Sequence, residues 1–208
     1  MEPAVRAAAE AARGFMPPDE GLALFRAGVT AGRAVPGAPL LEVGSYCGKS
    51  SIYLGDAARA TGTVLVAVDH HRGSEEHQPG EEYHDPALFD ATAGRMDSFR
   101  EFRRTLWRAG LEDTVVPVVA STVLASRAWR TPLAMVFIDG GHSKAAALAD
   151  YRCWSAHLIQ GGLLAIHDLF PDPAEGGQAP WEIYQLAVAS GLYEELPRVR
   201  TLGLLRRL

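Results

Sequence analysis

Short apolar runs alternate with longer amphipathic stretches through most of the chain. Five runs are apolar at nearly every position: residues 39–43, 64–68, 115–119, 134–138 and 163–166. A run without polar alternation is typical of a strand buried on both faces, as in a parallel sheet covered by helices. The pattern therefore predicts five buried parallel strands.

Stretches with helical periodicity separate these runs, at residues 49–60, 97–109, 143–158 and 180–190. Each is long enough to cross back over a parallel sheet. The tail, residues 193–199 and 201–208, leaves no room for another helix and suits a hairpin. We therefore expect a single α/β domain over residues 1–208, with helices in residues 1–38. Its fold is Rossmann-like and doubly wound, with a mostly parallel seven-stranded sheet and an antiparallel C-terminal hairpin.

A polar excursion, residues 70–96, interrupts this alternation after the second apolar run. It is rich in ionisable side chains, namely His70, His71, Glu75, Glu76, His77, Glu81, Glu82, His84, Asp85 and Asp90. Long loops inside compact domains are typically functional lids or disordered segments. A lid that faces the substrate and a solvated polar insertion both fit this composition.

Composition and charge narrow the function classes. The chain has 208 residues, 48% of them hydrophobic, and a formal net charge of -5. This excludes the disordered and disulfide-stapled classes, and the mild acidity offers no general footprint for nucleic acid. No apolar run approaches the roughly 20 residues that span a bilayer. Cys47 and Cys153 are far apart, which favours a reducing cytoplasm, and the Ala-rich N-terminal segments suggest a homodimer.

A glycine turn follows the first apolar run and leads directly into a helix, in the sequence Glu42-Val43-Gly44-Ser45-Tyr46-Cys47-Gly48-Lys49-Ser50. Such a turn lets the backbone approach a ligand and presents free N–H groups at a helix start. It has one residue fewer than the phosphate-binding GxxxxGK[ST] loop and lacks the GxGxxG of dinucleotide sites. Asp69 ends the second run, where a carboxylate accepts hydrogen bonds from ribose hydroxyls. A nucleoside without a phosphate chain fits this turn best.

Two further carboxylates follow neighbouring strands at the same edge of the predicted sheet. Asp139 comes after the fourth run with His142 three residues later, and the pair His167-Asp168 follows the fifth run. In an open α/β sheet these strand ends line the ligand crevice. Asp139 and Asp168 predict a divalent cation site that Mg²⁺ would accept. His167 could bind the metal, orient Asp168 or contact substrate.

These residues carry a family resemblance. The stretch Leu41 to Ser50 resembles the S-adenosylmethionine loop of class I methyltransferases and is particularly similar to that of catechol O-methyltransferases. The resemblance implies that Ser50 contacts the methionine carboxylate, Asp69 the ribose, and Ala120 and Ser121 the adenine. It implies a metal held by Asp139, His167 and Asp168, with His142 in place of the family's lysine base. The implied cofactor-binding residues are Glu42, Gly44, Ser45, Tyr46, Gly48, Ser50, Asp69, Ala120, Ser121 and Asp139.

The departures from the catechol enzymes point to another branch. The string Phe137-Ile138-Asp139-Gly140-Gly141-His142 is similar to bacterial O-methyltransferases of the macrocin type, which act on sugars and antibiotics. Within that branch the chain resembles the mycobacterial enzymes that methylate the 1-hydroxyl of 3-O-methylmannose oligosaccharides. The resemblance implies a sugar or oligosaccharide acceptor, with substrate contacts expected at His70, His142, His167, Trp181 and Glu182.

Two other function classes remain open on the sequence. The glycine turn could be an aberrant phosphate-binding loop of an ATP-using enzyme, with Asp139 as its Mg²⁺ ligand. The chain could also be a non-catalytic nucleoside-binding protein. Convergent His142, Asp139 and Asp168 argue against the latter, since binding alone needs neither a base nor a metal.

Overall fold

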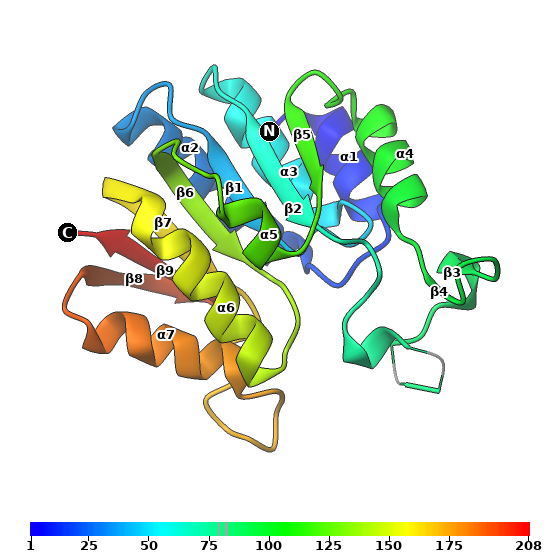
Figure 1. Ribbon diagram of the computed structural model, residues 1–208. Helices are drawn as coiled ribbons and strands as arrows, with labels where there is room; N and C mark the ends of the chain where they lie inside the picture. Colours follow the sequence, from blue (N-terminus) through cyan, green and yellow to red (C-terminus); the bar gives the residue numbers. More distant parts are fainter. Residues whose placement is uncertain (79, 82) are drawn as a thin grey trace.

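A seven-stranded sheet forms the centre of the computed structural model, which describes residues 1–78, 80–81 and 83–208 (Figure 1). The strand order is β5-β2-β1-β6-β7-β9-β8. The first five strands in this order are parallel, whereas β9 runs antiparallel to β7 and β8 antiparallel to β9. The strands are β1 Leu40–Val43, β2 Leu65–Asp69, β5 Val115–Val119, β6 Leu133–Ile138, β7 Leu158–Ile166, β8 Tyr193–Val199 and β9 Leu202–Arg207. The predicted fold class and C-terminal hairpin are confirmed.

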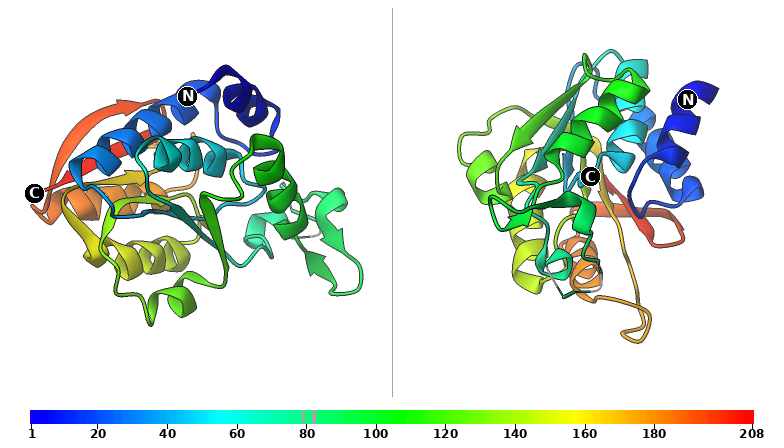
Figure 2. Two further views of the ribbon diagram at one scale, coloured as in Figure 1. Left: turned by 90° about the horizontal axis from the view of Figure 1, so that it is seen from above. Right: turned by 90° about the vertical axis from the view of Figure 1, so that its right-hand side faces the viewer.

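Helices cover both faces of the sheet (Figure 2), and each face has its own buried apolar cluster beneath the helices. On one face lie α1 Pro3–Ala11, α2 Pro18–Ala34, α3 Lys49–Ala60 and α4 Phe99–Ala109. On the other lie α5 Thr122–Ser126, α6 Lys144–Trp154 and α7 Ala179–Ala189. The N-terminal helices predicted within residues 1–38 are therefore present. Both begin at a proline, whose fixed φ suits the first helical position.

Helix α2 packs unusually close to α3 because glycines face the contact. A Cβ on Gly21 would lie 2.3 Å from the Tyr53 ring, and one on Gly28 would lie 2.8 Å from the Ala57 Cβ. The same helix also contacts β6 and β7. Glu20, in the first turn of α2, is only 1% exposed, although Pro18 and Asp19 before it are exposed.

Three predicted elements differ from the structure. Strand β5 was expected to be buried on both faces, but it is an edge strand with Val116 and Val119 about half exposed. Pro117 fits this position, because an edge strand tolerates the missing backbone donor. The helix predicted over 143–158 ends at Trp154, and β7 begins at Leu158 rather than at residue 163.

The excursion after β2 folds into short turns and a small hairpin. It contains 3-10 turns at Glu75–His77 and Pro86–Leu88, and the antiparallel strands β3 Phe89–Asp90 and β4 Arg95–Met96. Glu82, one of its acidic residues, lies outside the described residues. Arg13, between α1 and α2, forms an ion pair with Asp85. The excursion is thus joined to the N-terminal segment on the ligand side of the sheet.

In the described parts of the chain, no helix is both long enough and apolar enough to cross a membrane.

Candidate active site

The glycine turn after β1 is held by the carboxylate that ends β2. Asp69 Oδ2 accepts hydrogen bonds from the backbone N–H groups of Ser45 and Tyr46, at 2.9 and 2.8 Å. Its Oδ1 accepts from the His71 N–H at 2.7 Å. A carboxylate offers about four lone-pair positions, so one position on Oδ1 stays available for a ribose hydroxyl. Asp69 therefore shapes the turn as well as facing the ligand.

Two residues of the turn have backbone conformations that fix its path. Gly44 has φ of 85°, and a Cβ there would lie 2.1 Å from the carbonyl oxygen of Asp139. Only glycine allows β1 and β6 to approach this closely at their carboxyl ends. Tyr46 has φ of 46°, a left-handed conformation that costs on the order of 1–3 kcal/mol for a non-glycine residue and is concentrated at functional sites.

A first cavity of about 460 Å³ opens beside this turn. It is lined by most of the residues that the sequence assigns to the cofactor, together with residues that it does not. The predicted lining residues are Gly44, Tyr46, Asp69, His70, Ala120, Ser121, Asp139 and His142; the others include Ser98, Thr122, Gly140 and Asp150. The structure thus brings the ends of β1, β2, β5 and β6 to one cavity.

A second cavity of about 660 Å³ adjoins the first and shares its central wall. Gly44, Tyr46, Asp139, Gly140 and His142 line both cavities. The rest of the second cavity comes from the segment between α1 and α2, the first turn of α3, the excursion, and the loop after β7. Those residues include Arg13, Phe15, Met16, Lys49, Ser50, Tyr83, His167, Asp168, Phe170 and Gly176. A methyl donor in one cavity and an acceptor in the other would meet at the shared wall.

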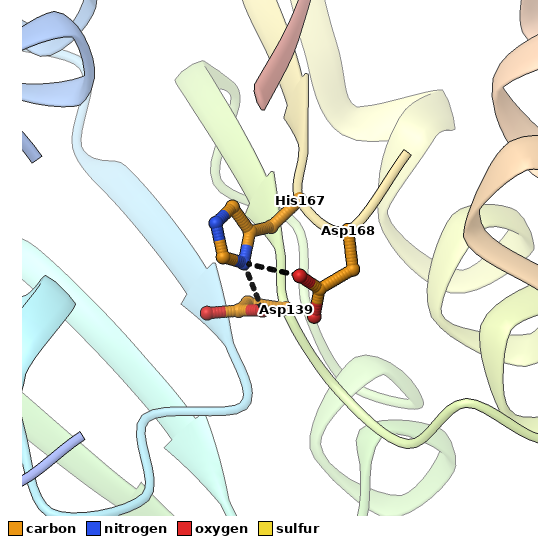
Figure 3. A group of neighbouring side chains, drawn as sticks. All are labelled: Asp139, His167 and Asp168. Atoms are coloured by element: carbon orange, nitrogen blue, oxygen red, sulfur yellow. Dashed lines mark hydrogen bonds and ion pairs between the residues drawn. The ribbon is translucent and has the colours of Figure 1, made fainter. Parts of the chain in front are cut away.

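An imidazole and two carboxylates converge on the second cavity, and one of them, Asp139, also lines the first (Figure 3). His167 Nδ1 lies 3.1 Å from Asp139 Oδ1 and 3.3 Å from Asp168 Oδ1. One ligand atom from each residue lies within 4.8 Å of the others. Asp168 has φ of 57°, so a strained backbone turns its carboxylate back toward the imidazole.

The opposite nitrogen of His167 contacts a residue that no sequence motif predicts. Glu20 Oε2, from the first turn of α2, lies 3.0 Å from His167 Nε2. Glu20 Oε1 accepts hydrogen bonds from both the backbone N–H and the hydroxyl of Thr201, in the turn between β8 and β9. No local motif marks Glu20, because its partners are far away along the chain. Its position at the buried start of a glycine-packed helix is the only signal.

The electrostatics of this cluster favour its charged forms. Burial would lower the pKa of His167, but the charge of Asp139 and hydrogen bonds with Asp139, Asp168 and Glu20 raise it well above its usual range. Burial would raise the pKa of Asp168, but hydrogen bonds and charge from His142 and His167 lower it. Hydrogen bonds from His167 and Thr201 similarly lower the pKa of Glu20 against the effect of burial. Asp168 and Glu20 are therefore ionised at neutral pH.

His142 lies between the cluster and both cavities. Its Nε2 is 3.1 Å from Asp168 Oδ2, and its side chain is 30% exposed. Asp168 thus contacts His167 through one oxygen and His142 through the other. A half-exposed imidazole oriented by a carboxylate is a suitable general base.

The chain's middle part identifies the family. Residues 41–169, well over half of the chain, match a family described as a methyltransferase domain. The chain belongs to this methyltransferase domain family. The matched region includes the glycine turn, Asp69, Asp139, His142, His167 and Asp168. The methyltransferase class predicted from the turn is confirmed.

Solved structures support the fold of the methyltransferase. The O-methyltransferase NovP is similar with a TM-score of 0.69 and 18% identity, covering 91% of this chain and 80% of that chain. Cofactor-bound Rv0187 from MTB has a TM-score of 0.64 and 18% identity, covering 98% and 86%. The O-methyltransferase from Bacillus cereus, in complex with SAH, has a TM-score of 0.62 and 18% identity, covering 98% and 87%. All three have the same architecture around a comparable sheet.

Lys49 of the methyltransferase has a structural role at the end of α1. Its Nζ lies 3.2 Å from the carbonyl oxygen of Ala12 and 3.5 Å from that of Glu10. Free carbonyl groups at a helix C-terminus attract a positively charged ammonium group. Its contacts point to the helix end rather than to a phosphate, which argues against an ATP-binding loop.

Several sequence-predicted residues lie elsewhere. Among the described residues that line the two main cavities, Glu42, Trp181 and Glu182 are not found. Glu42 is fully buried against Ser51, Trp181 stacks on Tyr184 beside Arg198, and Glu182 pairs with Lys144. His70, predicted to contact the acceptor, lines the first cavity only. Ser45 and Ser50 line the second cavity and not the first.

The aromatic wall of the second cavity comes from segments that the sequence left undecided. Phe15 stacks on Tyr46 at a centroid distance of 5.8 Å and meets Tyr83 edge-on at 5.3 Å. His77 packs against Tyr46 at 5.4 Å. Phe15 is 63% exposed despite this packing, so its ring has free area toward the cavity mouth.

Proposed function

We propose that the methyltransferase moves a methyl group from S-adenosylmethionine to a hydroxyl of a small sugar acceptor. The observation that carries this proposal is that His142 and Asp139 line both cavities, with His167 and Asp168 beside them on the second cavity. The first cavity suits the nucleoside of the donor, with Asp69 at the ribose. The second cavity suits the acceptor.

The reaction needs alignment and removal of one proton. The acceptor oxygen attacks the methyl carbon, the carbon–sulfur bond breaks, and its electron pair stays on sulfur. The acceptor loses its hydroxyl proton to His142, whose ring Asp168 orients. The products are a methyl ether, S-adenosylhomocysteine and a proton that His142 later releases to solvent.

The cluster also fits a divalent cation. Asp139 and Asp168 supply the oxygen ligands that Mg²⁺ prefers, and His167 turns Nδ1 toward them. Glu20 contacts Nε2, the arrangement in which a carboxylate orients a metal-binding histidine. We therefore propose that Asp139, His167 and Asp168 hold Mg²⁺ or a similar ion. When bound, the ion supplies positive charge that lowers the pKa of the acceptor hydroxyl.

The second cavity supports a sugar as the acceptor. Phe15, Tyr46 and Tyr83 offer aromatic faces that pack against the CH groups of a pyranose. Glu81 and Glu175 also line this cavity and could accept hydrogen bonds from hydroxyls. Within this class we propose the 1-hydroxyl of a 3-O-methylmannose oligosaccharide. An anomeric hydroxyl is the most acidic on a sugar and suits a base as weak as imidazole.

The cofactor is tested by calorimetric titration with S-adenosylhomocysteine, with Mg²⁺ and ATP as the paired control. Micromolar binding, about -8 kcal/mol, is expected for the first ligand and none for the second. The reverse result would replace the proposal with a phosphate-handling enzyme.

The acceptor is tested by methyl transfer from tritiated S-adenosylmethionine. Mannose, 3-O-methylmannose and its short oligosaccharides are compared with catechol, with Mg²⁺ or with chelator present. Transfer to the sugars that stops in chelator supports both parts of the proposal. Transfer to catechol alone contradicts the sugar acceptor, and full activity in chelator contradicts the metal.

A further inference from the structure

A buried acidic side chain lines the first cavity from α6, on the face of the sheet opposite α3. Asp150, on α6, is 5% exposed and lines the cavity together with Asp69, Thr122 and Gly140. Neither the glycine turn nor the strand-end motifs include it. Its helix lies beside α5, the short helix that follows the predicted adenine contacts Ala120 and Ser121 (Figure 1).

Gly140 is what allows the carboxyl to reach the cavity. A Cβ on Gly140 would lie 2.5 Å from Asp150 Oδ2, so any side chain there would displace the carboxyl. Gly140 also lines the cavity itself. The missing side chain therefore exposes a carboxyl at a point where a larger residue would have formed an apolar wall.

Asp150 forms a hydrogen bond with Thr122, and its buried surroundings disfavour the charged form of its carboxyl. Burial raises its pKa to about 7, a hydrogen bond with Thr122 opposes this, and the charge of Asp69 adds to it. Both carboxyl-bearing residues line the first cavity. A buried carboxyl is stabilised by any further hydrogen-bond donor that a ligand presents to it.

The ligand of this cavity presents such a donor in a suitable place. Asp69, Ser121, Thr122 and Asp150 line the same cavity, so a base attached to a ribose at Asp69 would have Asp150 among the polar groups around it. The exocyclic amino group of adenine carries two N–H donors, and carboxyl oxygens are acceptors. We propose that Asp150 accepts a hydrogen bond from this amino group and thereby selects an adenine nucleoside. This inference rests on the proposed function and names the group that reads its cofactor.

The selection follows from replacing a donor by an acceptor. In the 6-oxo base hypoxanthine, a carbonyl oxygen stands where adenine has its amino group. When Asp150 is ionised, that oxygen would face the oxygens of Asp150 and leave buried acceptors without a donor. Sites built around a buried hydrogen bond reject ligands that lack the matching group far more strongly than apolar pockets do.

The test compares S-adenosylhomocysteine with S-inosylhomocysteine, in which a carbonyl replaces the amino group and N1 carries a hydrogen, at pH 9, where Asp150 is ionised. Calorimetric dissociation constants are measured for the wild type, for Asp150→Asn, and for Asp56→Asn, which changes another buried aspartate that pairs with Arg59 on α3. The wild type and Asp56→Asn should prefer the adenine ligand by at least about 100-fold. In Asp150→Asn the amide can turn its NH₂ toward the 6-oxo group, so the preference should fall below about tenfold.

The ratio of the two constants separates recognition from a structural role. If Asp150 only holds Thr122 and α5, Asp150→Asn weakens both ligands equally and leaves the ratio unchanged, which overturns the proposal. Equal binding of both ligands by the wild type also overturns it. Should Asp150→Asn fail to fold, Asp150→Ser offers a hydroxyl donor and gives the same readout. Failure of the wild type to bind either ligand instead contradicts the proposed cofactor.

Discussion

The two sides of the active site are built in different ways. The glycine turn and Asp69 lie within 28 consecutive residues, 42–69, and their contacts are mostly from backbone to carboxylate. The imidazole–carboxylate cluster instead joins Glu20, Asp139, His142, His167 and Asp168, with side chains contacting one another across the sheet. The first side depends on local backbone geometry. The second depends on helix packing that brings α2 to the strand ends.

The two sides are therefore sensitive to different kinds of substitution. In the turn, positions are fixed by the space that the backbone leaves, so a single methyl group is disruptive. In the cluster, positions are fixed by hydrogen bonds between ionised groups, so isosteric changes should alter chemistry and affinity while the fold persists. A variant tests this difference best when a control changes the same type of residue at a place outside the active site.

The largest effect is expected for Gly44→Ala. Its Cβ would lie 2.1 Å from the Asp139 carbonyl at a φ of 85°, so β1 and β6 would have to separate. Gly37→Ala is the control, because Gly37 has a φ of 81° with nothing within 4 Å. The control should lose about 1–2 kcal/mol in denaturant unfolding, and Gly44→Ala more than about 4 kcal/mol. Equal losses would show that the turn tolerates the methyl group.

On the cluster side, His142→Ala should separate chemistry from binding. Turnover of tritiated S-adenosylmethionine with a mannose acceptor should fall about 10²–10⁴-fold, because the proton acceptor is lost. Affinity for S-adenosylhomocysteine should remain that of the wild type. His157→Ala, which removes an imidazole that packs on Trp154, is the control and should leave turnover unchanged. Loss of cofactor affinity in His142→Ala would make the residue structural.

The side formed by the glycine turn and Asp69 could be predicted from the sequence. Gly44, Asp69 and Asp139 follow from strand ends and glycine spacing, which depend on a few neighbouring residues. Glu20 could not be predicted, because only the tertiary packing of α2 against α3 brings it to His167. The aromatic wall was misplaced for the same reason: Trp181 has a suitable side chain, but the fold brings Phe15, Tyr46 and Tyr83 to the cavity.

The hydrophobic pattern also did not predict which strand lies at the sheet edge or where two elements end and begin. Val115 to Val119 is as apolar as a central strand, yet β5 lies at the sheet edge with two valines half exposed. Pro117 was the one residue that indicated an edge. The end of α6 and the start of β7 were displaced because residues 155–160 carry neither a helix cap nor a turn motif strong enough to mark the change.

Glu42, on the local side, gives a pH-dependent effect on stability. Burial raises its pKa to about 8 from 4.5, despite hydrogen bonds from Ser50 and Ser51. Between these values the folded state keeps a proton that the unfolded state releases, so stability falls as pH rises. Glu42→Gln removes this linkage. From pH 5 to 8 the wild type should lose roughly 3 kcal/mol relative to the variant in denaturant unfolding. Parallel curves for the two proteins would show that Glu42 is ionised in the folded state.

The smallest effect is expected at the most remote residue of the cluster. In Glu20→Gln an amide replaces the carboxylate beside His167 Nε2, and its single acceptor oxygen cannot accept from Thr201 and His167 together. Metal affinity, measured by Mn²⁺ titration with electron paramagnetic resonance, should weaken about 10–100-fold, as for other residues that orient metal-binding histidines.

Asp19→Asn makes that test specific to the contact with His167. Asp19 precedes Glu20 on α2 and pairs with Arg200 at 3.0 Å, in the same turn between β8 and β9 that Thr201 occupies. The substitution removes the same charge and a contact to the same turn, but it leaves His167 untouched. Mn²⁺ affinity should then stay at the wild-type value. If both variants weaken Mn²⁺ equally, the effect of Glu20 is one of general charge or of helix docking. If only Glu20→Gln does so, a helix outside the family's matched region sets the geometry of the metal-binding side.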